Sequence, residues 1–379
     1  MSDKVIAAFN EMFPEIPVMY SPRVGGGKSE KTEPAMSGVR FESSRDRNVI
    51  LYGPPGTGKT YHVVNVCLDL LNAEHNPDDR ASVTDTYQTL LNAGRIRFLT
   101  FHQSFSYEDF VEGIRPTLTT DADSTEHRPS GEPDELRYSI VDGIFKAICH
   151  SAALVPDKAF VLVIDEINRG NISGIFGELI TLIEDDKRLG RTEALTAVLP
   201  YSRKTFGVPD NLFIVGTMNT ADRSLTGLDL ALRRRFAFIE YPPNPSALTD
   251  ADGPWEVHGI RIADMLERLN LRLAALRGSE YAIGHAFFMS LADPDRRTFA
   301  DLSDIFRRRV IPLLREYFFD DPEGIRLALG QADVSSAAAN FVRRVASPAP
   351  LVGESWSFAD SALNEAGFYA QVAGTTQDA

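Results

Sequence analysis

The sequence predicts an α/β protein with a three-layer core, in which helices cover both faces of a parallel sheet, followed by a helical C-terminal part. Apolar runs typical of buried strands alternate with stretches of helical periodicity, as in a parallel sheet with helical crossovers. A glycine-rich segment joins the first apolar run to the first helical stretch. The predicted strands are Val49–Tyr52, Arg97–Phe101, Ala159–Ile164, Leu212–Thr217 and Phe236–Glu240.

The glycine-rich segment has the composition of a phosphate-binding loop. Its residues are Gly53, Pro54, Pro55, Gly56, Thr57, Gly58, Lys59 and Thr60, and a helix is predicted over Tyr61–Leu71. Glycines let backbone N–H groups turn toward a polyphosphate, and the helix N-terminus adds positive potential. Lys59 is placed to reach the β- and γ-phosphates, and the Thr60 hydroxyl to bind Mg²⁺. The alternative, a glycine-rich turn with a chance lysine, is disfavoured because a second motif agrees.

That second motif is a pair of carboxylates at the end of the third predicted strand. Asp165 and Glu166 follow the apolar run directly, and ligands of open α/β sheets bind at the carboxyl ends of the strands. Asp165 is placed to hold the Mg²⁺ ion, and Glu166 to polarise an attacking water. The alternative is a solvated pair of loop acids, which the phosphate loop upstream makes less favourable.

The charge of the chain excludes DNA binding by bulk electrostatics. The 379 residues include 53 acidic and 39 basic side chains, for a formal net charge of −14. An acidic chain does not attract the phosphate backbone. Any contact with nucleic acid must therefore come from a local basic patch, from oligomer geometry or from a partner.

Two further features concern the compartment. The N-terminus lacks the pattern of a signal peptide, and no apolar run reaches the length of a membrane span. We therefore expect a cytoplasmic protein that does not contact membranes. Cys67 and Cys149 both lie in predicted helices, and we expect buried small apolar residues rather than a disulfide or a metal pair.

The length predicts two domains, or one large domain with a lid. We assign residues 1–47 to a short helix and a flexible linker, residues 48–245 to a nucleotide-binding α/β domain, and residues 246–379 to a helical lid and tail. Helices are predicted over residues 142–154, Ile172–Asp186, Leu225–Arg234, Arg261–Arg277 and Asp301–Tyr317, part of a hairpin over Thr192–Pro200, and an exposed polar insertion over residues 117–135.

Several motifs resemble the McrB family of AAA+ proteins. They are Thr100–Phe110, Leu162–Asn171, Gly216–Ser224 and Leu228–Phe236 in the α/β part, and Ile283–Phe288 and Pro312–Asp321 in the C-terminal part. The Asn-Thr-Ala-Asp-Arg-Ser element that begins at Asn219 is quite specific to this branch. The resemblance covers roughly residues 45–330 and implies an AAA+ P-loop NTPase core with a C-terminal helical lid that closes over the nucleotide.

The resemblance also implies a function. The family is known for hydrolysing GTP rather than ATP, for forming hexameric rings, and for driving an McrC-type nuclease in restriction of foreign DNA. It implies a GTPase motor that meets DNA through the complex. ATP stays open, because the phosphate loop contacts only phosphates. The alternatives are an ATP-dependent, protein-remodelling chaperone of the MoxR type and a nucleotide-gated scaffold; Glu166 disfavours the scaffold, which needs no activated water.

Individual residues match the motifs of the family. Asn219 matches the sensor that helps to position water, and Asp222 and Arg223 match the family signature near the hydrolysis site. The remaining matches are Lys59 and Thr60 in Walker A, and Asp165 and Glu166 in Walker B.

Arg233 and Arg234 stand where AAA+ proteins usually place an arginine finger, with Arg235 a less certain member of the group. A guanidinium supplied by a neighbouring subunit neutralises the charge that develops on the γ-phosphate. The alternative is a solvated basic helix end that complements the helix dipole. Which single arginine acts stays open.

Better-known members of the family carry an N-terminal domain that reads modified DNA. The segment before residue 48 is too short for such a domain. We expect a member with a motor alone, a truncated chain, or one that relies on another subunit for recognition, and the resemblance does not extend to direct recognition of methylated cytosine.

Overall fold

A computed structural model describes residues 46–76, 79–118, 136–222, 230–331, 339–345 and 355–374. The predicted N-terminal helix and most of the linker, most of the polar insertion and Arg223 lie outside the described residues.

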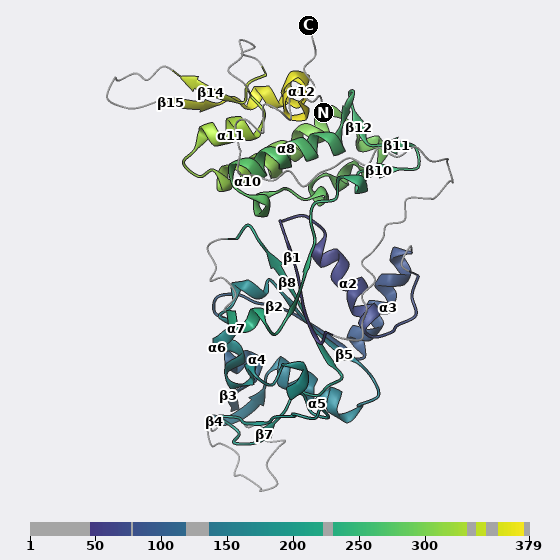
Figure 1. Cartoon of the computed structure of the whole chain (residues 1–379), viewed down its shortest axis with the longest axis vertical. Coiled ribbons are helices and arrows are strands. Elements are labelled where there is room, and N and C mark those ends of the chain that lie inside the picture. The colour runs from purple at the N-terminus through teal and green to yellow at the C-terminus, as the bar shows by residue number, and fades with distance from the viewer. Residues whose placement is uncertain are drawn as a thin grey trace, which may run out of the picture. The chain divides into compact units, whose positions relative to one another are not determined.

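A five-stranded sheet forms the centre of the α/β part (Figure 1). Its order is β2-β5-β8-β1-β9, and every neighbouring pair is parallel. The strands are β1 (Asn48–Gly53), β2 (Ile96–Thr100), β5 (Phe160–Asp165), β8 (Leu212–Asn219) and β9 (Ala237–Glu240). All five predicted strands are confirmed. Gly53 pairs with Asn219, so the carboxyl ends of β1 and β8 lie side by side.

Helices cover both faces of this sheet, because successive residues of a buried strand point to opposite faces. Ile50 and Leu162 pack in one apolar cluster, and Leu51 and Val163 pack in the other. The helices that contribute to the second cluster are α2 (Lys59–Leu70) and α3 (Arg80–Asn92), and those of the first are α4 (Tyr107–Phe110), α5 (Ile144–Leu154), α6 (Ile172–Phe176) and α7 (Leu230–Arg233). The three-layer core is confirmed, and the buried, free Cys67 and Cys149 each belong to one of the clusters.

The predicted helix over Ile172–Asp186 is wrong as a single element. Helix α6 ends at Phe176, and a 3-10 turn follows over Gly177–Ile180. Gly177 has φ +51° and ψ −132°, a conformation that is not helical and that favours glycine. A Cβ atom there would lie 3.2 Å from the Tyr107 ring, a tight contact that glycine avoids.

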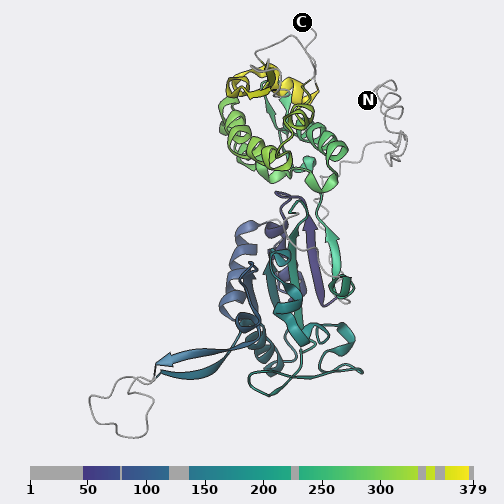
Figure 2. The same cartoon turned by 90° about the vertical axis from the view of Figure 1, so that its left-hand side faces the viewer.

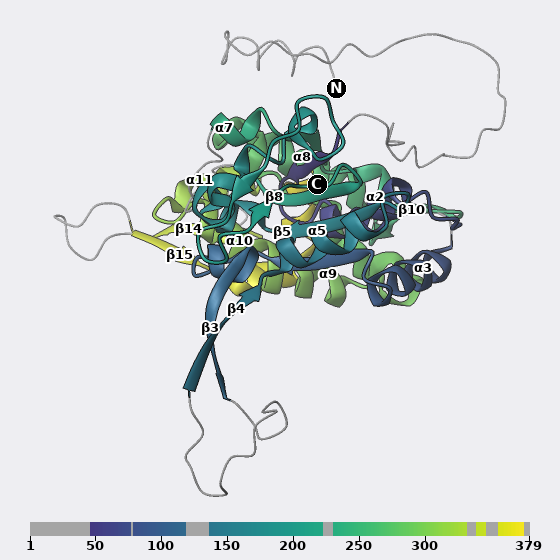
Figure 3. The ribbon, with the colours of Figure 1, turned by 90° about the horizontal axis from the view of Figure 1, so that it is seen from below.

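Two hairpins extend the α/β part. β3 (Glu112–Leu118) pairs with β4 (Leu136–Asp142), and this hairpin, which the sequence did not predict, projects from the body of the molecule (Figures 2 and 3). The first two residues of the predicted polar insertion, Thr117 and Leu118, belong to β3. β6 (Ala197–Val198) pairs with β7 (Thr205–Phe206), which confirms the hairpin expected near Thr192–Pro200.

The C-terminal part has an apolar core of its own, which extends from Leu248 to Ala373. The helix predicted over Asp301–Tyr317 is interrupted by a π-helical turn over Phe306–Val310. The helices of the C-terminal part are α8 (Ile262–Leu276), α9 (Phe299–Ile305), α10 (Ile311–Tyr317), α11 (Pro322–Ala328) and α12 (Ala366–Ala373). Its short hairpins are β10–β11 (Thr249–Asp250 with Gly253–Pro254), β12–β13 (Glu256–Val257 with Ile260–Arg261) and β14–β15 (Val342–Val345 with Ser355–Phe358).

The domain boundary placed between residues 245 and 246 stays a prediction. None of the helices in the described ranges has the length and apolar composition that crossing a bilayer requires.

Candidate nucleotide-binding site

The glycine-rich segment forms a loop between β1 and α2. Gly56 and Gly58 have φ of +74° and +83°, in the left-handed region that glycine adopts without strain. Lys59 is the first residue of α2 and is only 6% exposed. Its Nζ atom donates to the carbonyl oxygens of Gly53 and Pro54, at 2.9 and 2.7 Å. The ammonium group therefore lies inside the loop.

The surroundings of Lys59 change the pKa of its ammonium group. Burial lowers the pKa of Lys59 to about 8, although the carboxylates of Glu166 and Asp165 oppose this shift. The loop is tied to the neighbouring strand, because the Thr220 N–H group donates to the Gly53 carbonyl oxygen at 3.1 Å. Lys59 thus interacts electrostatically with the acidic pair, and a hydrogen bond connects the phosphate loop to the residue after β8.

The acidic pair is held by a threonine of β8. The Thr217 hydroxyl donates to Asp165 Oδ1 at 2.6 Å and accepts from the Glu166 N–H group at 3.1 Å. Glu166 has φ +51° and ψ +47°, and a left-handed non-glycine residue costs about 1–3 kcal/mol. Such strain persists only where the surroundings enforce it, and it is concentrated at functional sites.

The Glu166 carboxylate contacts two side chains. Its Oε1 atom accepts from Asn219 Nδ2, and its Oε2 atom lies 3.3 Å from Arg169 Nε. Arg169 Nη2 also donates to Asp222 Oδ2 at 3.0 Å. Burial raises the pKa of Glu166; Arg169 opposes this shift, whereas Asp165 and Asp222 add to it. The structure therefore brings together the predicted residues Glu166, Asn219 and Asp222.

Arg169 and Thr217 belong to this cluster but were not predicted as site residues. Arg169 follows Glu166 by three residues, a spacing that lets two side chains meet across one turn. That spacing was a signal in the sequence. Thr217 gave a weaker signal, because its role depends on the pairing of β5 with β8.

The residues expected to hold Mg²⁺ have suitable chemistry. Thr60 is exposed at the start of α2, and Asp165 ends β5. Mg²⁺ in nucleotide sites commonly takes one or two carboxylates together with phosphate and water oxygens. Within the described ranges no cluster of three or more His, Cys, Asp or Glu residues is suited to a metal. The Thr60 hydroxyl and the Asp165 carboxylate fit this ion, because phosphate and water oxygens would complete the coordination shell of Mg²⁺.

The candidate finger residues lie away from this cluster. Arg233 and Arg234 are exposed at the end of α7. Arg234 lines a cavity of about 550 Å³ together with Asn48 and Ala237, the first residues of β1 and β9. The cavity is thus at the amino edge of the sheet, whereas the phosphate loop follows the carboxyl end of β1. Arg235 forms an ion pair with Glu184 at 2.7 Å.

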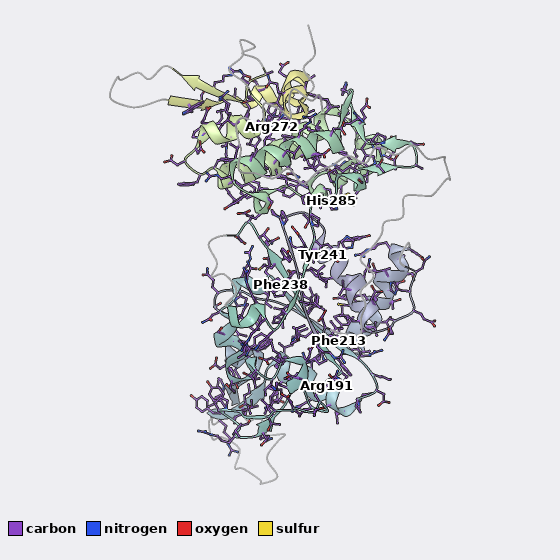
Figure 4. The ribbon with its side chains drawn as sticks, viewed as in Figure 1. Arg191, Phe213, Phe238, Tyr241, Arg272 and His285 are labelled. Carbon is purple, nitrogen blue, oxygen red and sulfur yellow. The ribbon has the colours of Figure 1, made fainter. Side chains whose placement is uncertain are left out.

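The C-terminal part also reaches the phosphate loop. A Cβ atom on Gly58 would lie 3.5 Å from the His62 ring and 3.8 Å from His285 Nε2. His285 and Tyr241 are labelled in Figure 4, and the Tyr241 ring lies 5.3 Å from that of His62. The His285 Nδ1 atom accepts from the Asn244 N–H group at 3.2 Å. The loop is therefore bordered by residues of both parts of the chain.

Comparisons with known proteins identify the family of the chain. Residues 80–236 match the family of the AAA domain (dynein-related subfamily), and residues 261–326 match the McrB alpha-helical lid domain. The chain is 37% identical over 290 residues to the type IV methyl-directed restriction enzyme EcoKMcrB subunit of Escherichia coli (strain K12), covering 73% of this chain and 55% of that protein.

A second relative is the type II restriction enzyme BsuMI component YdiS of Bacillus subtilis (strain 168). It is 28% identical over 229 residues, covering 56% of this chain and 61% of that protein. The chain thus spans a little over half the length of these curated relatives. With its five-stranded parallel sheet, its phosphate loop and its helical lid, the chain belongs to the McrB family of AAA+ P-loop NTPases.

Proposed function

We propose that this chain is the motor subunit of a DNA restriction system and that it hydrolyses GTP. The observation that carries the proposal is the contact of Glu166 with Asn219, beside a buried Lys59, in a chain of the McrB family. A carboxylate and an amide at the carboxyl edge of a parallel sheet are suited to orienting a water for attack on a phosphate.

The roles of the site residues follow from their positions. The loop amides and Lys59 bind the β- and γ-phosphates, and Thr60 and Asp165 would hold Mg²⁺, which neutralises phosphate charge when bound. Glu166 accepts the proton of the attacking water. Its raised pKa suits this role, because a general base is most effective when its pKa approaches the working pH.

Asn219 and Arg169 position the base rather than react. Asn219 donates to one carboxylate oxygen of Glu166, and the guanidinium of Arg169 lies beside the other. Arg169 also connects Glu166 to Asp222, so a movement of Asp222 would change the electrostatic environment of the Glu166 carboxylate. We propose that Asp222, and Arg223 next to it in the sequence, influence hydrolysis through this effect on Glu166.

Assembly into a ring, hexameric as the family resemblance implies, would complete the site. Arg233 or Arg234 of one subunit would act on the γ-phosphate bound by its neighbour. Both arginines are exposed, and Arg234 lines the cavity at the amino edge of the sheet, which supports action between subunits.

The partner is proposed to be an McrC-type nuclease, and DNA to be contacted through the complex. The two relatives are named as a subunit and as a component of restriction enzymes, which supports a multisubunit assembly. The net charge of −14 disfavours DNA binding by the free chain.

Base preference and partner are tested by two experiments. Competition binding with GTP and ATP is expected to favour GTP, and a clear preference for ATP would overturn that part of the proposal. Addition of a purified McrC-type subunit and DNA is expected to stimulate hydrolysis by the wild type but not by Glu166→Gln. Use of ATP without response to that subunit would instead favour a remodelling chaperone.

A further inference from the structure

A segment of the lid, residues 283–288, is hydrogen-bonded to the phosphate loop; we call it the strap. The Gly284 N–H group donates to the Pro55 carbonyl oxygen at 3.0 Å, and the Ala286 N–H group donates to the Gly56 carbonyl oxygen at 2.9 Å. These are backbone contacts between segments more than two hundred residues apart. They therefore depend on the fold and not on side-chain identity alone.

The two bonds determine the direction of two amides. A trans peptide unit is planar, so its N–H group points away from its carbonyl group. The Pro55 carbonyl group shares its peptide unit with the Gly56 N–H group, and the Gly56 carbonyl group shares its unit with the Thr57 N–H group. Because Pro54 and Pro55 have no N–H group, these amides are the first two backbone donors after Gly53. Because the two carbonyl groups point toward the strap, the Gly56 and Thr57 N–H groups point to the opposite side of the loop backbone.

Close packing shows that the contact is specific. Gly284 has φ −76° and ψ 156°, an ordinary conformation that any residue adopts. A Cβ atom on Gly284 would nevertheless overlap the carbonyl group of Gly56, and one on Gly56 would overlap the Phe287 ring. Glycine at position 284 is therefore required by the approach of the two backbones.

The lid holds the strap in place. The Asn270 side chain of α8 donates to the Ile283 carbonyl oxygen at 2.9 Å and accepts from its N–H group at 2.7 Å. Ile283 and Phe288, on either side of the loop contacts, are fully buried in the apolar core of the lid. The strap is thus anchored at both ends.

We propose that the strap is a positioning element of the phosphate site, which orients the Gly56 and Thr57 amides toward the bound polyphosphate. The inference rests on the proposed binding of a nucleoside triphosphate by this loop. It makes nucleotide affinity depend on the lid through backbone contacts, in addition to any contact of lid side chains with the nucleotide.

The first test is Gly284→Ala, with Gly367→Ala as matched control. Gly367 belongs to α12 of the lid, and a Cβ atom there would meet only Ala339, at 3.3 Å. Titration calorimetry with non-hydrolysable GTP and ATP analogues should show binding to Gly284→Ala weakened by about tenfold or more, since two charge-assisted donors lose their alignment. Gly367→Ala should bind within about twofold of the wild type.

A second pair of variants separates positioning from folding. Ala286→Pro removes one strap donor in the first turn of the 3-10 helix, where no hydrogen bond within the helix is lost, and Ala286→Ser keeps the donor. Ala286→Pro should weaken binding and raise KM while kcat at saturation changes little, whereas a general loss of structure would lower kcat and the melting temperature.

The outcomes distinguish the two proposals. A wild type that binds neither analogue would overturn the proposed function itself. A wild type that binds, together with Ala286→Pro that binds as tightly as Ala286→Ser, would overturn the positioning role of the strap and leave the proposed function intact.

Discussion

Replacement of Lys146 by methionine should destabilise the protein strongly. Lys146 lies on α5 at the base of the β3–β4 hairpin, and its Nζ atom is 2.7 Å from both Glu112 Oε2 and Asp142 Oδ1. Glu112 is 0% exposed. Its other oxygen accepts from the N–H groups of Tyr201 and Ser202, at 3.2 and 2.8 Å. The methionine therefore leaves a buried carboxylate without a counter-charge.

The size of the effect follows from this geometry. Removing one partner of a buried ion pair costs about 3–5 kcal/mol, because the remaining charge is uncompensated. Two amide hydrogen bonds to Glu112 persist, so we expect the lower end of that range, about 3 kcal/mol at neutral pH. Lys187→Met is the matched control, since Lys187 pairs with the exposed carboxylates of Asp186 and Glu193, and its loss should change stability little.

The pH dependence gives an independent check. Burial alone would raise the pKa of Glu112, but its hydrogen bonds to Lys146 and Ser202 lower it overall. A carboxylate with a lowered pKa stabilises the fold above its unfolded value of about 4.5, and this contribution is lost as the pH falls through the folded value. In Lys146→Met, Glu112 takes up its proton at higher pH than in the wild type. The difference in the free energy of unfolding between the wild type and Lys146→Met should therefore become smaller in acid.

Equilibrium urea unfolding followed by circular dichroism, at neutral and at acidic pH, measures both effects. Equal stabilities of Lys146→Met and wild type at neutral pH, or a gap that widens in acid, would refute the reasoning.

Three further predictions concern the nucleotide site. Lys59→Ala should weaken nucleotide binding itself, measured by calorimetry, because the buried ammonium group of the loop is lost. Arg169→Ala should raise the pKa of Glu166, since Arg169 opposes the effect of burial, so the acid limb of the pH–rate profile should move to higher pH; an unchanged limb would exclude this role. Arg233→Ala or Arg234→Ala should keep nucleotide affinity but lose hydrolysis in rings, and mixing the inactive finger variant with Glu166→Gln should restore part of the activity; no recovery in rings shown to be mixed would argue against a finger.

The central sheet and the proximity of the main candidate site residues were predictable because their signals are local. A buried parallel strand is apolar over its whole length, and each of the five runs became a strand of the sheet. The phosphate loop and the acidic pair were found from composition and from their place after a strand. Parallel pairing then places the ends of β5 and β8 side by side, which is why Glu166 and Asn219 meet.

The remaining features depend on contacts between distant segments. Gly177 ends α6 in a conformation that no local pattern indicated. Arg188 is fully buried and donates to the Leu212 carbonyl oxygen and to Asn48 Oδ1, both at 2.6 Å, although its polar sequence context is typical of a surface. The strap contacts join positions 284 and 55, and spacing within the sequence carries no information about such a pair.

The most direct test of the account is the rate of phosphate release at saturating nucleotide for the wild type and for Glu166→Gln. The amide keeps the shape of the carboxylate but is not a base, so binding of GTP should persist while hydrolysis falls by roughly 10²–10⁴-fold. Hydrolysis by Glu166→Gln at the wild-type rate would contradict the assignment of Glu166 as the base and with it the proposed mechanism.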